Sequence, residues 1–296
     1  MILKKQMINV AVAGGELAVA RWPNNGPTIV LVHGISSSHL AWGSIAEKLS
    51  SLGFDVIAPD LRGRGASNSL QGRYGLAAHQ EDLCRVIEQL SQKPVFLAGH
   101  SMGAYVGVEF GVRFPDYLER LILVDGGLAL PRPSSVEPEE YLRKTLGPAV
   151  DRLSLEFKSI EDYLDFWHKH PAFLDAINWN DDVERFFTYD LEEISGGYKS
   201  RVVKEAVFAD GKGLMAPSMV SMIDRVTAPM LLMTAERGLL NQPKPMLPVQ
   251  AVEEKSIAIE HLTWIEVPAT NHYSITLSTG VGPVTKAIEA FCRLES

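Results

Sequence analysis

The segment Pro94-Val-Phe-Leu-Ala-Gly-His-Ser-Met-Gly103 joins an apolar run to a turn in which glycines flank a serine. The run 95–98 is entirely apolar, which is typical of a strand covered on both faces of a sheet. The spacing Gly99-x-Ser101-x-Gly103 fits a sharp strand-to-helix turn that lifts the serine hydroxyl above the sheet edge. Side chains two residues before and after that serine would collide, which explains both glycines. We therefore predict that Ser101 is a nucleophile.

Strand-like and helix-like segments alternate on both sides of this turn. Continuous apolar runs predict strands, and apolar residues that recur every three or four positions predict helices. The expected strands are 28–32, 55–58, 95–98, 121–124, 229–233 and 263–267, and the expected helices are about 42–52, 77–91, 102–113, 245–260 and 281–294. Weak alternation at 7–13 and 16–22 predicts an antiparallel hairpin. This order predicts an α/β fold with a doubly wound, mostly parallel sheet.

The alternation is interrupted in the middle of the chain. Residues 129–224 contain many aromatic side chains and no strand-like run, and three prolines mark the entrance to this segment. We therefore expect one core domain built from residues 1–128 and 225–296, interrupted by a helical insertion at 129–224.

The composition narrows the classes of partner. The 296 residues carry a net charge of −8, so the chain lacks the basic surface that binds nucleic acid or anionic membranes. The sequence has no signal-peptide pattern and no apolar run approaching the roughly 18 residues of a membrane span. It also has no metal-ligand cluster, phosphate loop or dinucleotide fingerprint. We expect a cytoplasmic protein that acts on a small molecule without a metal or cofactor, and the oligomeric state stays open.

A serine hydroxyl needs a general base to react at neutral pH. Among the eight histidines, His272 follows the last expected strand and precedes the last expected helix. This order places it at the carboxyl edge of the sheet, where the sites of open α/β folds gather. We predict that His272 is the base. His100 is expected to point away and pack, and His39, His79 and His261 are expected at ordinary surface or helix positions.

The oxyanion formed during acyl transfer needs backbone N–H donors. Met102, the residue after the nucleophile, would supply one donor at the start of a helix. The loop after the expected strand 28–32 reads His33-Gly34-Ile35-Ser36, and its glycine allows a close turn. We expect the Ile35 amide to be the second donor.

Together these motifs resemble those of the α/β-hydrolase superfamily. The matches are His33-Gly34 followed by Trp42, Asp60-Leu-Arg-Gly-Arg-Gly65-x-Ser67, Gly99-His-Ser-Met-Gly103 and the late His272. They occur in the order that the family uses and extend over nearly the whole chain. The resemblance implies that the insertion is a helical cap and that Asp60 to Gly65 form a structural turn. It also implies acyl transfer, because relatives that cleave haloalkanes or epoxides carry an aspartate where this chain has Ser101.

The carboxylate that would orient the histidine is absent from the family's usual position. That position, after the seventh strand, corresponds here to Gly238, and no aspartate follows residue 225. Asp125 is the first candidate, because it directly follows the expected strand 121–124, where some family members place their acid. Glu236, two residues before the usual position, is the alternative, and Asp224 or an incomplete triad also stay open. We predict a triad of Ser101, His272 and Asp125.

The residues and the resemblance together predict a serine hydrolase of the esterase or lactonase type. It would cleave a carboxylic ester or lactone of an apolar small molecule through an acyl-serine intermediate. The expected substrate-binding residues are Trp42, Trp167, Trp179 and Phe187. One alternative is cleavage of a carbon–carbon bond in a diketone-type substrate, because relatives with that activity also keep the serine. The other is a hydrolase-fold receptor that binds an apolar ligand without turnover.

Overall fold

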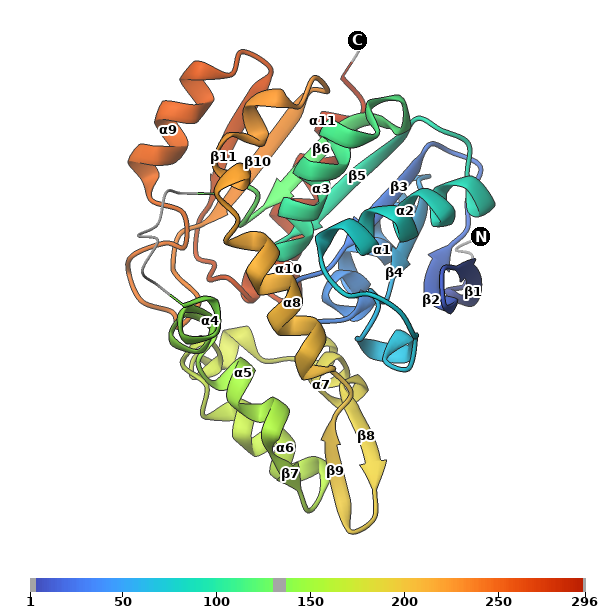
Figure 1. Cartoon of the computed structure of the whole chain (residues 1–296). Helices are drawn as coiled ribbons and strands as arrows, with labels where there is room; N and C mark the ends of the chain where they lie inside the picture. Colours follow the sequence, from blue (N-terminus) through green and yellow to red (C-terminus); the bar gives the residue numbers. More distant parts are fainter. Residues whose placement is uncertain (1–3, 130–136, 295–296) are drawn as a thin grey trace.

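The computed structural model of the chain describes residues 4–129 and 137–294. Its main sheet has eight strands in the order β1-β2-β4-β3-β5-β6-β10-β11. These strands are β1 (Gln6–Val12), β2 (Gly15–Trp22), β3 (Thr28–Val32), β4 (Asp55–Pro59), β5 (Val95–His100), β6 (Leu118–Val124), β10 (Met230–Ala235) and β11 (Leu262–Val267). The β1–β2 and β2–β4 pairs are antiparallel, and the other pairs of this sheet are parallel. The predicted mostly parallel sheet is therefore confirmed, with the N-terminal hairpin at one edge (Figure 1).

Helices cover both faces of this sheet, as a doubly wound fold requires. The covering helices are α1 (Gly43–Ser51), α2 (Leu76–Leu90), α3 (Met102–Arg113), α9 (Val249–Ala258) and α11 (Val281–Cys292). One apolar cluster joins α1 and α11 to one face of the strands, and the other cluster joins α2, α3 and α9 to the opposite face. Alternate residues of each central strand enter different clusters, because successive side chains of a strand point to opposite faces.

The register of the central strands aligns their carboxyl ends. Val32 of β3 pairs with Gly99 of β5, and His100 of β5 pairs with Val124 of β6. Val124 in turn pairs with Met233 of β10. Residues that directly follow these strands therefore emerge at one edge of the sheet, although they lie far apart in the sequence.

Residues 137–224, which we call the insertion, lie beyond that edge (Figure 1). The insertion contains α4 (Pro138–Leu146), α5 (Pro148–Asp151), α6 (Ile160–His168), α7 (Asp181–Tyr189) and α8 (Lys204–Leu214). It also contains a small antiparallel sheet of β7 (Glu156–Phe157), β8 (Leu191–Ile194) and β9 (Gly197–Ser200). The expectation of an insertion without strands was wrong, because strands of two to four residues are too short to show a period in the sequence.

Buried polar contacts join the insertion to the main sheet. The Tyr189 hydroxyl at the end of α7 donates to Asp60 at 2.6 Å, and His39 Nδ1 lies 2.9 Å from the same carboxylate. Burial raises the pKa of Asp60, but the hydrogen bonds from His39 outweigh this effect and lower it to about 2. The carboxylate is therefore ionised at neutral pH and forms a charged anchor between the two parts of the chain.

A second anchor connects α8 with α2 and with the segment that follows β4. Asp210 on α8 lies 2.5 Å from the Arg64 guanidinium and 3.0 Å from Nε2 of His79, and all three side chains are fully buried. The expectation that His39 and His79 occupy ordinary surface or helix positions was right only for the helix, since His79 lies in α2, but both side chains are buried. Each histidine is buried because it pairs with an aspartate distant in the sequence, and buried charges are retained in proteins when they are paired.

Candidate active site

Ser101 lies in the turn between β5 and α3, with backbone angles φ 54° and ψ −121°. Such a positive φ is strained for a residue with a side chain and is typical of functional turns. A Cβ on Gly99 would lie 2.2 Å from the Gly103 carbonyl oxygen, and a Cβ on Gly103 would lie 2.1 Å from that of Val32. The two glycines are therefore required because α3 packs closely against β5 and β3.

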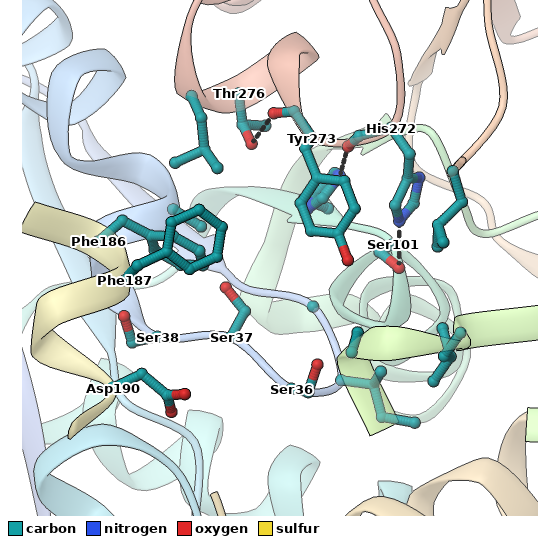
Figure 2. Close-up of a pocket in the computed structure, with 18 of the residues that line it drawn as sticks. Ser36, Ser37, Ser38, Ser101, Phe186, Phe187, Asp190, His272, Tyr273 and Thr276 are labelled. Atoms are coloured by element: carbon teal, nitrogen blue, oxygen red, sulfur yellow. Dashed lines mark hydrogen bonds between the residues drawn. The ribbon is translucent and has the colours of Figure 1, made fainter. Parts of the chain in front are cut away.

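Ser101 and His272 are joined by a hydrogen bond, with 3.0 Å between the serine Oγ and the imidazole Nε2 (Figure 2). On the other side of the ring, His272 Nδ1 donates to Oδ2 of Asp125 at 2.6 Å. A proton on Nδ1 leaves the Nε2 lone pair free to accept the serine proton. The structure thus brings these three predicted residues together at the aligned strand ends.

Asp125 is held in place by the neighbouring strand. Its Oδ1 accepts a hydrogen bond from the Ala235 amide at 3.1 Å, and its own amide donates to the Met233 carbonyl at 2.7 Å. Its backbone φ is 46°, and the residue is only 2% exposed. The pairing of β6 with β10 therefore fixes the carboxylate beneath the imidazole.

The other proposed acids lie elsewhere. Glu236 is exposed, and its Oε2 accepts a hydrogen bond from the Ala269 amide at 2.7 Å. It therefore supports the loop that carries His272 without contacting the imidazole. Asp224 is paired with Lys255 at 2.5 Å.

The loop expected to contribute an oxyanion donor lies directly against Ser101. Gly34 and Ile35 line the same cavity as the serine, and a Cβ on Gly34 would lie 3.3 Å from the Ser101 Cβ. Within the described part of the chain, the Ile35 N–H donates no hydrogen bond. Met102 is the first residue of α3, so its N–H has no acceptor within the helix. Both predicted amides are therefore available to a substrate oxygen.

A buried histidine holds this loop in place. His33 Nδ1 donates to the Gly34 carbonyl at 2.7 Å, and Nε2 accepts from the Leu61 amide at 3.0 Å. The Arg64 guanidinium adds a hydrogen bond to the Ile35 carbonyl at 2.9 Å. Burial lowers the pKa of His33 to about 3, so the ring remains neutral at physiological pH.

The low pKa of His33 predicts how stability responds to acid. The unfolded chain binds a proton on this histidine below about pH 6.5, whereas the folded chain does not until about pH 3. The unfolded state therefore gains protons as the pH falls, and His33 makes the free energy of unfolding decrease over that range. Between pH 7.5 and pH 5, we expect this one group to account for a loss of about 2 kcal/mol.

Urea unfolding at several pH values measures this loss. The free energy of unfolding should fall less steeply with decreasing pH in His33→Gln than in the wild type. It should fall as steeply as in the wild type in His168→Gln, because His168 is about half exposed. An equal slope in His33→Gln and the wild type would contradict the prediction.

The cavity above Ser101 has a free volume of about 50 Å³, enough for a few water molecules. Its walls come from the 34–38 loop, the β5–α3 turn, the insertion and the segment that follows His272 (Figure 2). Two of the predicted substrate-binding residues, Trp167 and Phe187, line it, with their rings stacked at 4.1 Å between centroids. They form an apolar wall opposite the serine.

The other two predicted substrate-binding residues do not line this cavity. Trp42 is fully buried in the apolar cluster between α1 and the sheet, because its side chain turns toward the core just before α1 begins. Trp179 stacks on Phe187 at 5.7 Å and thus forms a second layer behind the wall. The prediction that Trp42 and Trp179 line the substrate site was therefore wrong.

Sequence reasoning missed several cavity residues. They include Ser36, Ser37 and Ser38 of the loop, Arg152 and Asp190 of the insertion, and Tyr273. The adjacency of Tyr273 to His272, and of Ser36 to Ile35, was a usable signal, whereas nothing local marked the residues of the insertion. His100 also lines the cavity, and its Nε2 donates to the His272 carbonyl at 2.9 Å. The expectation that His100 points away was wrong, since it supports the histidine loop.

No helix among the described residues combines the length and apolar character needed to cross a membrane. Within the same residues, histidine, cysteine, aspartate and glutamate side chains form no group of three or more placed to bind a metal ion.

The fold and the site geometry agree with the sequence comparisons. A family model described as alpha/beta hydrolase fold matches residues 27–176. The AB hydrolase superfamily protein YfhM of Bacillus subtilis is 31% identical over 206 residues, which cover 58% of this chain and 68% of that protein. This chain belongs to the α/β hydrolase fold family.

Other similarities are more limited in extent or identity. An uncharacterized protein of Mycobacterium tuberculosis is 37% identical over 107 residues, which cover 36% of this chain and 31% of that protein. The chain thus spans about a third of the length of this curated relative. The solved structure of E-2-(acetamidomethylene)succinate hydrolase matches with a TM-score of 0.80 at 22% identity, covering 98% of this chain and 100% of that chain. At this identity, the likeness shows the fold.

Proposed function

We propose that this chain is a serine hydrolase that cleaves a carboxylic ester or lactone of a small molecule. The observation that carries the proposal is the hydrogen-bonded series Ser101–His272–Asp125, which opens into a small, largely apolar cavity. Two free backbone amides beside the serine complete the groups needed for acyl transfer.

The first half of the reaction forms the acyl-serine. Ser101 Oγ attacks the substrate carbonyl carbon while His272 Nε2 takes the serine proton. The negative charge that develops on the carbonyl oxygen is stabilised by the amides of Ile35 and Met102. The tetrahedral intermediate then collapses, and His272 returns its proton to the departing alcohol. Asp125 stabilises the imidazolium that exists between these proton transfers.

The second half regenerates the free enzyme. His272 Nε2 takes a proton from a water molecule, whose oxygen attacks the acyl carbon. The second tetrahedral intermediate expels Ser101 Oγ, which receives the proton from His272. One ester bond and one water molecule are consumed, and one acid and one alcohol are released.

We propose that the insertion acts as a cap over this reaction. Phe186, Phe187 and Trp167 of the insertion line the cavity across from Ser101, so they would exclude bulk water and select the substrate. The free volume of about 50 Å³ favours short acyl and alcohol groups. This size and the apolar wall together favour small, mostly apolar esters.

A turnover screen tests the proposed function. We expect the wild type to hydrolyse short esters or lactones faster than long-chain esters or vinylogous diketones, and Ser101 to react rapidly with a fluorophosphonate. Efficient cleavage of the diketones alone would assign the chain to carbon–carbon bond hydrolysis. Measurable ligand binding with neither turnover nor labelling would instead indicate a receptor and overturn the proposal.

A further inference from the structure

One side of the cavity carries hydroxyl groups without a partner. The Tyr273 ring lies between the Phe186–Phe187 pair and His272, with its hydroxyl pointing into the cavity toward the 34–38 loop (Figure 2). On that loop, the side chains of Ser36 and Ser37 also line the cavity. Within the described part of the chain, none of these three hydroxyls makes a hydrogen bond.

The position of the tyrosine is fixed by its neighbours. Its ring contacts those of Phe173 and His170, with centroid distances of 5.2 and 5.3 Å, and that of His272 at 5.9 Å. Burial raises the pKa of Tyr273 to about 12, so the hydroxyl stays protonated and able to donate. A rigid donor that lacks an acceptor in a confined site favours a ligand that supplies one.

The nearby charged groups already satisfy one another. Arg152 Nε lies 3.0 Å from Asp190, and its terminal nitrogen donates to the Ser36 carbonyl at 2.8 Å. Asp190 also accepts hydrogen bonds from Tyr163 and Ser200. Because this ion pair is internally compensated, the free side-chain donors on this side of the cavity are neutral hydroxyls. A neutral hydroxyl can donate to a ketone oxygen or to a carboxylate oxygen.

We propose that Tyr273, with Ser36 and Ser37, forms a subsite for a second oxygen of the substrate, a carbonyl or carboxylate oxygen outside the scissile ester group. This inference rests on the proposed function for its substrate class, although the binding itself does not require turnover. An ester without that oxygen would leave the hydroxyls unpaired when it displaces water from the cavity, and such unpaired groups weaken binding.

Two sets of esters matched in chain length test the subsite. Methyl pentanoate, methyl 4-oxopentanoate and monomethyl succinate vary the acyl side, whereas butyl acetate and 3-oxobutyl acetate vary the alcohol side. Calorimetric binding to Ser101→Ala measures affinity without hydrolysis. In at least one set, we expect the oxygen-bearing ester to bind about tenfold more tightly than its apolar counterpart. Comparison of methyl 4-oxopentanoate with monomethyl succinate then shows whether the subsite prefers a neutral ketone oxygen or a charged carboxylate oxygen.

The decisive comparison uses Tyr273→Phe, which keeps the ring and removes only the hydroxyl. In Ser101→Ala/Tyr273→Phe, the affinity for the oxygen-bearing ester divided by that for its apolar counterpart should fall close to one. In Tyr273→Phe alone, the same ratio of kcat/KM values should fall likewise. The matched control is Tyr117→Phe, whose hydroxyl donates to Glu88 on the exposed surface and which should keep the wild-type ratios. Melting temperatures verify that the variants fold.

Two outcomes would overturn the subsite. One is equal affinity of Ser101→Ala for oxygen-bearing and apolar esters in both sets. The other is a preference that survives in Ser101→Ala/Tyr273→Phe. Absence of hydrolysis by the wild type, with the binding preference intact, would contradict the proposed function and leave the subsite supported.

Discussion

Replacement of Ser101 by alanine should lower kcat/KM by about 10⁶-fold on the best ester substrate. In the proposed mechanism, Oγ of Ser101 bonds to the acyl group, and His272 and the amides of Ile35 and Met102 lie around this hydroxyl. Without the hydroxyl, the imidazole has no serine proton to accept, and only substrate binding and oxyanion stabilisation remain. A small rate above that in water should therefore persist.

The expected loss is specific to this serine. Ser51→Ala, which removes an exposed hydroxyl bonded to the Lys48 carbonyl, should hydrolyse the ester at the wild-type rate. Fluorophosphonate labelling should disappear in Ser101→Ala and persist in Ser51→Ala. If Ser101→Ala retained more than a few per cent of the activity, Ser101 would not be the nucleophile.

Asp125→Asn should lower kcat by about 10⁴-fold while the protein remains folded. An asparagine at this position fits the same space but carries no negative charge to stabilise the imidazolium. Its amide also favours the wrong tautomer, because an N–H directed at Nδ1 places the imidazole proton on Nε2. The serine then faces a donor in place of an acceptor. Steady-state kinetics together with a melting temperature separate this loss from unfolding.

Glu236→Gln is the matched comparison for the alternative acid. The glutamine oxygen can still accept the hydrogen bond from the Ala269 amide, so the histidine loop should keep its position and most of the activity. A large loss in Glu236→Gln with a mild effect in Asp125→Asn would assign the acid to Glu236.

The sequence predicted the central sheet well because its strands are buried on both faces and read as continuous apolar runs. The same reasoning singled out Ser101 and His272, since each lies in the turn or loop that follows a predicted strand. The sequence favoured Asp125 but left Glu236 open, because the position of either carboxylate depends on how β6 and β10 pair, as the Asp125 hydrogen bond to the Ala235 amide illustrates.

Errors arose where a side chain's environment is set by distant segments. His79 appeared to be an ordinary helix residue, yet its partner Asp210 lies 131 positions further along the chain. Trp42 belonged to a motif near the site, but its direction depends on how α1 packs against the sheet. The strands β7 to β9 have only two to four residues, which is too short for a period to mark them in the sequence.

The anchors between the insertion and the sheet limit how freely the two parts can be recombined. A chimaera that exchanged the insertion for that of another family member would lose Tyr189 and Asp210 and leave Asp60 and Arg64 buried without these partners. Breaking a buried ion pair costs about 3–5 kcal/mol, a large share of the stability of a typical domain. Transplanted insertions should therefore fold on this sheet only when they bring equivalent anchoring residues. Substrate range can diversify more readily through residues such as Phe186, which line the cavity and hold no anchor.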